Sequence, residues 1–211
     1  MNWDDFLAPY KQAVEELKVK LRGMRAQFER EEVHSPIEFV TGRVKPVASI
    51  LDKAESKAIP LEKVGEELQD IAGLRMMCQF VDDIKLVVHL LRMRNDFEIV
   101  EERDYISNKK NSGYRSYHVV IKYPVQTIQG EKNILAEIQI RTLAMNFWAT
   151  IEHSLNYKYK GQFPDEIRVR LKRAAEAAYL LDEEMSEIAL EIQEAQRVFS
   201  RKKDEGQNTI I

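Results

Sequence analysis

Two stripes of apolar residues at helical spacing, one near each end of the chain, constrain the fold of this sequence most. Side chains three or four positions apart lie on one face of an α-helix, so each stripe predicts a long amphipathic helix. In residues 1–32 the stripe is Leu7, Tyr10, Val14, Leu17, Leu21, Met24 and Phe28. In residues 164–203 it is Leu171, Ala174, Ala178, Leu181, Met185, Ile188, Ile192, Ala195 and Phe199. We expect residues 204–211 to form a frayed tail.

The segment between these helices, residues 36–160, has a different pattern. Short apolar runs predict strands at 73–80, 96–105, 117–123 and 133–141. Helical spacing predicts helices at 82–94 and 142–159, with Thr142 as the N-cap of the second. This order predicts an α/β (α+β) fold, in which a mixed, largely antiparallel sheet is flanked by helices. A length of 211 residues suits one domain, residues 1–211.

Composition excludes several classes of protein. The net charge of −3 attracts neither nucleic acid nor membranes over the whole surface, so an anion site must be local. The single Cys78 cannot form an intramolecular disulfide. No stretch is long and apolar enough to span a bilayer, and the start of the chain does not have the pattern of a secretory leader. We therefore expect a cytoplasmic protein that has no membrane partner.

One face of the predicted sheet carries hydrogen-bonding and charged side chains. Alternation along the strands places apolar residues on one face. The other face receives Arg75, Met77, Gln79, His118, Val120, Lys122, Leu135, Glu137, Gln139 and Arg141. An amphipathic sheet with one solvated face accounts for each strand taken alone. Three strands present the same kinds of group, so a polar face that binds a ligand is a reasonable alternative to a solvated face.

Residues 105–130 contain no Asp or Glu, although the chain has 35 acidic and 32 basic residues. The basic side chains of this run are Lys109, Lys110, Arg115, His118 and Lys122. Their gathering favours a phosphate-bearing ligand. Gly113 would let the backbone approach that ligand, and the Tyr114 ring offers a face on which a base can stack. Tyr117 alternates in phase with apolar residues, so we expect it to pack in the core.

A second candidate anion site lies at residues 41–53, "TGRVKPVASILDK". The pattern predicts a glycine turn entering a helix, with Pro46 in the first turn. Lys45, Ser49 and Lys53 are four positions apart and share one face. A cation near a helix N-terminus is unfavourable unless a phosphate binds there, and a solvated helix face is the alternative.

Two carboxylates complete the candidate chemistry. Asp70 precedes the first predicted strand, and Glu137 lies inside the last one on the polar face. Carboxylates from two elements can hold Mg²⁺ together with phosphate oxygens. An ion pair of Glu137 with Arg141 or Lys122 is the alternative, and spacing alone does not decide between the two.

Five segments together resemble the small alarmone synthetases of the RelQ type, in the Rel/Spo family. They are EFVTGRVKP, QDIAGLRMMCQF, SGYRSYH, EIQIRTLAMNFWATIEHSLNYKY and LDEEMSEI, and the resemblance extends over nearly the whole chain. It implies a nucleotidyltransferase-like fold and a GTP diphosphokinase of the stringent response. Such an enzyme transfers the β,γ-pyrophosphate of ATP to the 3′-OH of GTP or GDP, which makes (p)ppGpp and AMP. None of the four histidines precedes an Asp, so the metal-binding pair of a hydrolase half is missing.

The resemblance also implies roles for single residues. For ATP these are Arg43 and Arg75 around the adenine, Lys45, Ser49 and Lys53 on the phosphates, and Glu152 near the adenine. For the acceptor they are Tyr114 on the guanine, Lys110, His118 and Arg103 on the phosphates, and Gln139 and Asn146 in the pocket. Asp70 and Glu137 are the implied Mg²⁺ ligands and catalytic residues, and Glu137 is the candidate base for the 3′-OH. Glu55 and Ser56 depart from relatives that carry basic residues there.

The resemblance further implies a homotetramer, which the apolar stripes would serve. The alternative is that the first and last helices pack on each other. A (p)ppGpp activator is expected in a central cleft, with Phe39, Thr41 and Gly42 as candidate contacts. Two other functions stay open at this point: a nucleotidyltransferase that releases pyrophosphate, and a regulatory module that binds single-stranded RNA through the acid-free run.

Overall fold

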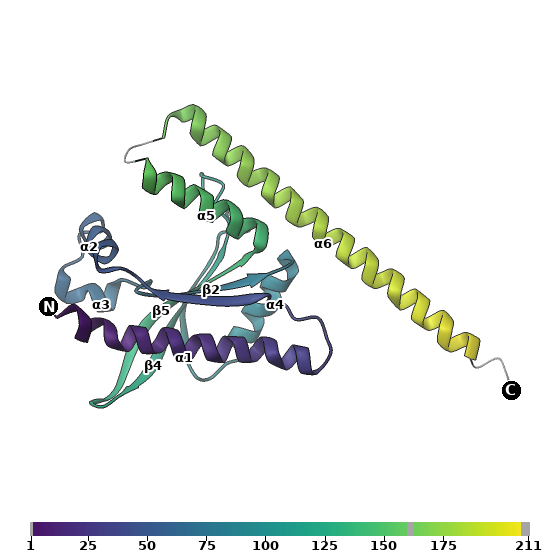
Figure 1. Cartoon of the computed structure of the whole chain (residues 1–211), viewed down its shortest axis with the longest axis horizontal. Helices are drawn as coiled ribbons and strands as arrows, with labels where there is room; N and C mark the ends of the chain where they lie inside the picture. Colours follow the sequence, from purple (N-terminus) through teal and green to yellow (C-terminus); the bar gives the residue numbers. More distant parts are fainter. Residues whose placement is uncertain (1, 160–162, 208–211) are drawn as a thin grey trace.

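A five-stranded sheet forms the centre of the molecule (Figure 1). The computed structural model describes residues 2–159 and 163–207, the side chains of 157–158 and 198–207 excepted. The strands are β1 (Phe39–Val44), β2 (Ala72–Cys78), β3 (Glu98–Asp104), β4 (Tyr117–Thr127) and β5 (Gly130–Thr142). Their order is β1-β2-β5-β4-β3, and β2 pairs with β5 in parallel whereas the other pairs are antiparallel. The predicted mixed, largely antiparallel sheet is confirmed.

Helices cover this sheet and extend beyond it. They are α1 (Trp3–Arg30), α2 (Val47–Ser56), α3 (Val64–Glu67), α4 (Val81–Arg92), α5 (Leu143–Lys158) and α6 (Asp165–Gln207), with a 3₁₀ turn (Leu61–Lys63) before α3. α1 packs along β1 and β2, α4 packs against β5 and β2, and α6 packs against α5 and α4. The far half of α6 projects away from the sheet (Figure 1). Residues 204–207, which were expected to be a frayed tail, are helical, because α6 runs to Gln207, and residues 208–211 lie outside the described part.

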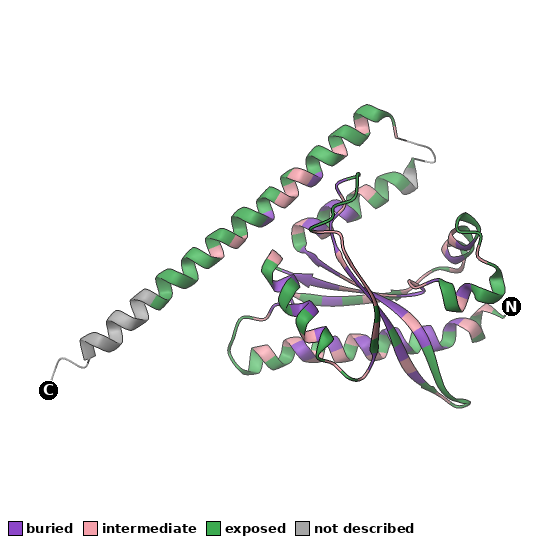
Figure 2. Cartoon of the chain, turned by 180° about the vertical axis from the view of Figure 1, so that it is seen from behind, coloured by how far each residue is buried: buried purple, intermediate pink, exposed green. Residues whose placement is uncertain are grey.

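The two predicted helical stripes have different environments. The stripe of α1 is buried under the sheet at Leu7, Tyr10, Val14, Leu17, Leu21 and Met24. The stripe of α6 is largely exposed at Leu181, Met185, Ile188 and Ile192, and Figure 2 shows this long exposed helix. Packing of the first and last helices on each other is therefore wrong for the described residues. The side chain of Phe199 lies outside the described part.

The first strand was missed because its glycine has an unexpected role. The sequence predicts a turn at Gly42, but this residue lies inside β1 and pairs with Leu74 of β2. A Cβ atom on Gly42 would lie 3.0 Å from Cγ1 of Val14, so α1 crosses β1 too closely for a side chain. Pro46 is the N-cap residue of α2 rather than part of its first turn.

A β-bulge in β3 changes which side chains face the polar side of the sheet. Ile99 pairs with Ile121 of β4, whereas Glu101 pairs with Val120, so the register shifts at Val100. An extra residue reverses the alternation along a strand. Ile99 therefore packs against the core, while Glu101 and Arg103 share the face that carries His118.

A buried contact joins α6 to the start of α5. The Thr142 hydroxyl caps α5 by accepting from the Met145 amide, and it donates to the Asp182 carboxylate at 2.6 Å. Burial raises the pKa of the Asp182 carboxyl to about 6, against the opposing hydrogen bond from Thr142 and charge of Arg115. Asp182 therefore holds a proton more tightly in the folded chain than in the unfolded chain.

We predict that Asp182→Asn removes a pH-dependent loss of stability. The wild-type chain gains stability by protonating Asp182 as pH falls through about 6, and it loses this gain as pH rises. The melting temperature of the variant should exceed that of wild type at pH 8 by about 2–4 °C, as a free energy near 1 kcal/mol produces in a chain of this size. The difference should shrink as pH falls below about 6 and vanish only below the ordinary carboxyl pKa of 3.8. A difference independent of pH, or one equal to that of the exposed control Asp52→Asn, would contradict the assignment.

Candidate active site

Two rows of cross-strand neighbours form the polar face of the sheet. One row runs across all five strands through Thr41, Arg75, Gln139, His118 and Arg103. The next row runs through Arg43, Gly73, Glu137, Val120 and Glu101. Since neighbours in a row point to the same side, strand register alone gathers side chains that are far apart in sequence.

A pocket of about 220 Å³ opens over the β1 and β2 end of this face. Its lining residues are Thr41, Gly42, Arg43, Lys45, Asp70, Gly73, Leu74, Arg75, Glu137 and Gln139. Burial, and then the charges of Arg141 and Arg43, lower the pKa of the Arg75 guanidinium. Clustered cations of this kind suit an anionic ligand or the face of an aromatic base.

Asp70 is held by the two predicted phosphate-binding lysines. Its Oδ2 accepts from Nζ of Lys53 at 2.7 Å and from Nζ of Lys45 at 3.1 Å. Burial acts to raise the pKa of the Asp70 carboxyl, but the hydrogen bonds and charges of the two lysines bring it below its usual value. The other oxygen, Oδ1, is buried and has no partner within the described residues. An ionised carboxylate with one unused oxygen at a pocket wall suits a hard cation such as Mg²⁺.

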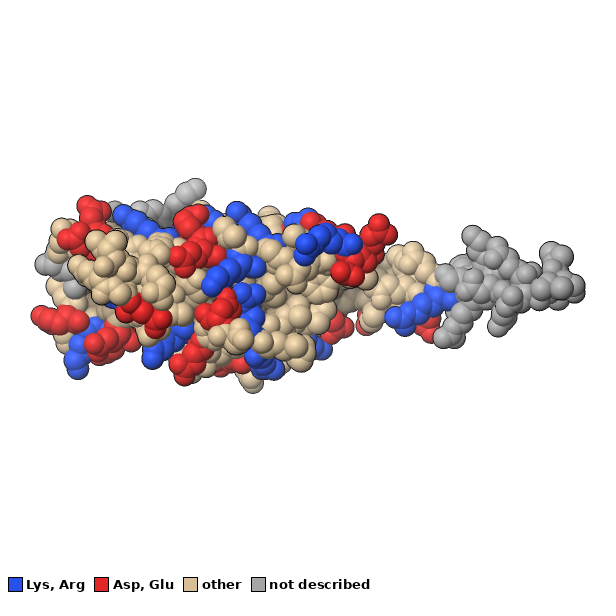
Figure 3. Space-filling model, turned by 90° about the horizontal axis from the view of Figure 1, so that it is seen from below, with Lys and Arg blue, Asp and Glu red and all other residues tan. Residues whose placement is uncertain are grey.

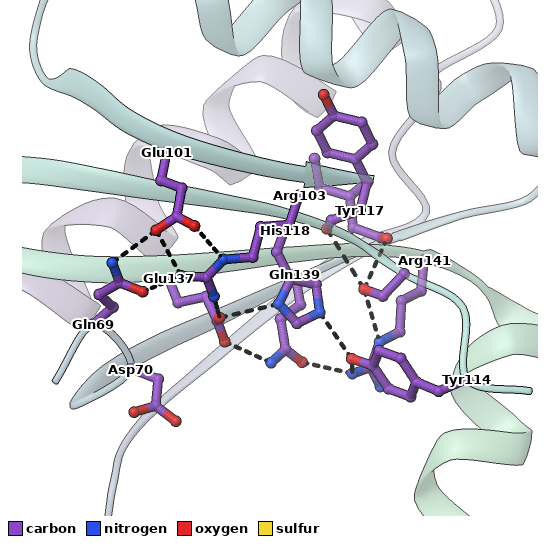
Figure 4. Close-up of polar contacts among 12 residues, drawn as sticks. Gln69, Asp70, Glu101, Arg103, Tyr114, Tyr117, His118, Glu137, Gln139 and Arg141 are labelled. Carbon is purple, nitrogen blue, oxygen red and sulfur yellow. Dashed lines mark hydrogen bonds and ion pairs between the residues drawn. The ribbon is translucent and has the colours of Figure 1, made fainter. Parts of the chain in front are cut away.

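Glu137 lies at the centre of a hydrogen-bond network (Figure 4). Its Oε1 contacts Nδ1 of His118 at 3.0 Å, and its Oε2 accepts from Nε2 of Gln139 at 2.7 Å. Nη1 of Arg103 lies 3.8 Å from Oε1. The alternative partners Arg141 and Lys122 are therefore wrong, because the carboxylate pairs with other groups of the polar face.

This network keeps Glu137 ionised. Burial alone would raise its pKa, but the hydrogen bond and charge of His118, followed by Gln139 and Lys53, lower the pKa to about 2. A carboxylate with so low a pKa is a weak proton acceptor at neutral pH. It remains a strong hydrogen-bond acceptor and a suitable metal ligand.

A chain of hydrogen bonds links Glu137 to the predicted base-stacking residue. Nη2 of Arg141 donates to the Tyr114 hydroxyl at 2.6 Å, and that hydroxyl lies 2.8 Å from Nε2 of His118. Because an ionised carboxylate only accepts, Nδ1–H of His118 donates to Glu137, and the Tyr114 hydroxyl bridges Nε2 of His118 and the Arg141 guanidinium. Burial raises the pKa of Tyr114. The acceptor loop, residues 105–116, is thereby tied to the carboxylate.

The acid-free run does not form a single cationic site. Lys109 and Arg115 both pair with Glu176 of α6, at 3.0 and 3.1 Å. Lys110 instead lies over the rings of Tyr105 and Tyr114, with Nζ 4.4 and 5.1 Å from their centroids. Lys110 is thus the lysine of this run that lies beside Tyr114. The sequence could not reveal that Glu176 of α6 provides the acidic partner that the run itself does not contain.

Some predicted residues lie away from this centre. Glu152 hydrogen-bonds Asn156 and lines a second pocket between α5 and α6 with Trp148. Asn146 is half-buried on α5, with its Oδ1 unpartnered in the described part, and Ser49 is half-buried on α2. Thr41 and Gly42, predicted for a separate activator surface, line the first pocket, whereas Phe39 is exposed on β1.

Two residues of the network were not predicted. Glu101 of β3 accepts from Arg103 at 2.6 Å and from Gln69 at 2.8 Å. The bulge at Val100 hid Glu101 from the alternation, and Gln69 lies outside any strand. The sequence of β3, EIVEERD, mixes acidic and basic side chains, and this mixture was the feature that could have indicated a role of β3 in the site.

The chain is similar in sequence and in fold to proteins of one known family. Residues 42–162 match the family described as the region found in RelA/SpoT proteins. A GTP pyrophosphokinase of Bacillus subtilis, YjbM, is 68% identical over 202 residues, which cover 96% of this chain and 95% of that one. The crystal structure of small alarmone synthetase 1 from B. subtilis bound to its product pppGpp is 67% identical, with a TM-score of 0.88, and covers 90% of this chain and 98% of that one. The same B. subtilis protein bound to AMPCPP gives a TM-score of 0.81 at 63% identity, over 91% and 98% of the two chains.

We predict that Asp70→Asn destabilises the fold at neutral pH. The substitution leaves Lys45 and Lys53 facing each other without an acid, so the free energy of unfolding should fall by about 1–2 kcal/mol. Because the pKa of Asp70 is lowered in the folded chain, its contribution is present at neutral pH and should be lost as pH falls through that lowered pKa. Urea denaturation at pH 7.5 and pH 3 measures both effects. Asp52→Asn, on the exposed face of α2, is the control, and equal stability of both variants at pH 7.5 would contradict the pairing.

Proposed function

The chain belongs to the RelA/SpoT family, and from this premise we propose that it is a GTP pyrophosphokinase that makes (p)ppGpp. It transfers the β,γ-pyrophosphate of ATP to the 3′-OH of GTP or GDP and releases AMP. The observation that carries this function is the joining of Asp70, Glu137 and two arginines in one pocket on the polar face. Similar proteins supply independent support, since one binds pppGpp and AMPCPP in crystals.

The first pocket is the ATP site in this proposal. Arg43 and Arg75 lie on adjacent antiparallel strands at its rim, and planar guanidinium groups can hold an adenine between them. Lys45 and Lys53 reach the same point, where both contact Asp70. Phosphates bound here would replace the Asp70 carboxylate as the anionic partner of the two lysines. Little water would have to be removed from the lysines, because they are already paired. Ser49, between them on α2, adds a hydroxyl donor.

Asp70 and Glu137 are the proposed Mg²⁺ ligands. The unpartnered Oδ1 of Asp70 supports this choice, and both carboxylates line one pocket. The described residues contain no cluster of three or more acidic, His or Cys side chains suited to a metal, so phosphate oxygens and water must complete the coordination. When bound, the ion would neutralise charge on the transferred diphosphate.

Glu137 orients the acceptor rather than removing its proton early. With its pKa at about 2, it can accept a hydrogen bond from the 3′-OH and aim that oxygen at the β-phosphorus. Phosphoryl transfer passes through a loose transition state that needs positioning and charge stabilisation more than a strong base. Holding both nucleotides in register can contribute about 7–11 kcal/mol to this step.

The acceptor site continues along the face towards β3 and the loop. His118, Arg103 and Gln139 line the row beside Glu137, and Lys110 lies over the Tyr114 ring. Tyr114 is proposed to stack on guanine, His118, Arg103 and Lys110 to hold its phosphates, and Gln139 and Asn146 to complete the pocket. Glu152 is the least supported assignment, because it faces α6.

The proposed partners are nucleotides and further copies of this chain. The exposed apolar stripe of α6, together with the exposed Phe147 and Ile151 of α5, supports a homotetramer. A (p)ppGpp activator at Phe39, Thr41 and Gly42 would then lie close to the ATP site, because two of these residues line it. None of the described helices is long and apolar enough to cross a membrane. We propose a cytoplasmic location.

Binding to single-stranded RNA has less support. Lys109 and Arg115 are paired with an acid, and on the face seen in Figure 3 acidic and basic side chains are interspersed. Such a surface lacks the continuous basic track that unspecific strand binding uses.

Product analysis tests the reaction. The purified protein is incubated with ATP, GDP and Mg²⁺, and nucleotides are separated by chromatography. We expect AMP and ppGpp in equal amounts, with no free pyrophosphate, because the 3′-OH attacks the β-phosphorus and AMP is the leaving group. Release of pyrophosphate with transfer of the adenylyl group would instead indicate a nucleotidyltransferase and overturn the proposal.

We predict that Glu137→Gln lowers kcat by about a thousandfold, as loss of a charge placed at the reacting centre does. Binding of GDP, measured by calorimetry, should change little, because the amide oxygen of the new side chain can still accept from His118. Glu131→Gln, on the exposed end of β5, is the matched control. Normal turnover by the Glu137 variant would remove the residue from the chemistry.

A further inference from the structure

The acceptor loop, residues 105–116, rests on α6 through a buried arginine. Arg115 is 5% exposed, and its guanidinium donates to the Ala175 carbonyl at 3.3 Å and to the Glu176 carboxylate at 3.1 Å. The same guanidinium lies 4.0 Å from the centre of the Tyr179 ring. A buried arginine that meets a carbonyl, a carboxylate and an aromatic face has one favourable position. The backbone next to Tyr114 is therefore fixed to one turn of α6.

The turn of the loop fits against the same helix. Gly113 has a φ of +92°, and a Cβ atom there would lie 2.6 Å from Cβ of Ala175. The next residue, Tyr114, packs its ring against the small cluster of Trp148, Ala149 and Ala175. Contact this close requires a glycine in the loop and a small residue on the helix. The position of Tyr114 thus depends on where α6 lies.

Glu176 joins two cations of the loop. Besides Arg115, it accepts from Nζ of Lys109 at 3.0 Å, so one carboxylate of α6 holds both sides of the turn that carries Lys110 and Tyr114. Between these anchors, Asn111 and Ser112 are exposed. A loop of this kind loses conformational freedom on binding unless other contacts have already ordered it.

We propose that Arg115, Glu176 and Tyr179 are positioning residues that hold the acceptor loop in its nucleotide-binding form, so that α6 sets the affinity for the acceptor nucleotide. This rests on the proposed function, in which Tyr114 and Lys110 contact the guanine nucleotide. None of the three touches the reacting atoms. The ATP pocket lies over β1 and β2 and shares no lining residue with this contact.

The proposal therefore predicts a selective effect. Weakening the contact should raise the KM and the Kd for GDP, because binding must then order the loop. The Kd for a non-hydrolysable ATP analogue should stay the same. A contact that only stabilises the fold would lower the melting temperature and affect both nucleotides alike, or neither.

The test uses two substitutions on α6, each with a matched control. Glu176→Ala removes the carboxylate, and Glu187→Ala removes an exposed carboxylate of the same helix. Tyr179→Leu removes the ring under Arg115, and Tyr179→Phe restores that ring without the hydroxyl. Calorimetry gives the Kd for GDP and for the ATP analogue separately, and light scattering checks that all variants have the same assembly state. Tyr114→Ala shows the size of a full loss of stacking.

We expect Glu176→Ala and Tyr179→Leu to weaken GDP binding by about fivefold, the scale of a partly exposed ion pair. ATP-analogue binding and both controls should match the wild-type protein. Unchanged GDP binding in both variants, or parallel losses for both nucleotides, would overturn the proposal. A wild-type protein that binds GDP but makes no ppGpp would refute the proposed function while leaving the loop test valid. A wild-type protein that does not bind GDP would overturn both.

Discussion

The site depends on the register between β2, β5 and β4. Parallel pairing sets Arg75 beside Gln139, and antiparallel pairing sets His118 on the other side of Gln139. A slip of one residue in any of these strands would turn a charged side chain into the core packed under α1 and α4. Every second side chain of these strands is apolar and buried in the core. The free energy of burying these side chains therefore selects the register that also forms the polar face. The sheet thus forms the core of the molecule and also positions the side chains of the candidate active site.

Charge on this face is arranged so that the acids stay ionised. Two lysines hold Asp70, and His118 and Gln139 hold Glu137, although burial opposes ionisation of both. The two ionised carboxylates can therefore bind a cation, and the basic side chains around them can bind phosphates. The same contacts make Glu137 a poor proton acceptor, which agrees with a reaction that depends on position and charge. The network extends through Tyr114 to the acceptor loop and from there to α6.

The sequence predicted what local alternation and spacing determine. Glu137, Gln139 and His118 were assigned to one face by period-two alternation, and Lys45 and Lys53 to one side of a helix by their spacing. The order of strands and helices predicted the fold class, and five matching segments predicted the family and the activity of a GTP pyrophosphokinase. Features fixed by distant packing were missed. Gly42 signals a close crossing by α1 rather than a turn, and Glu101 reaches the site through a bulge. Glu176 lies 61 residues from Arg115, a separation that no local pattern can bridge.

The central claim is that two nucleotides meet on this face with a metal-bound diphosphate between them. A crystal structure with a non-hydrolysable ATP analogue, GDP and Mg²⁺ tests it most directly. The account predicts an ion about 2.1 Å from Oδ1 of Asp70 and from a Glu137 oxygen, with the adenine between Arg43 and Arg75 and the guanine on Tyr114. Nucleotides bound away from the polar face, or an ion that contacts neither carboxylate, would contradict it.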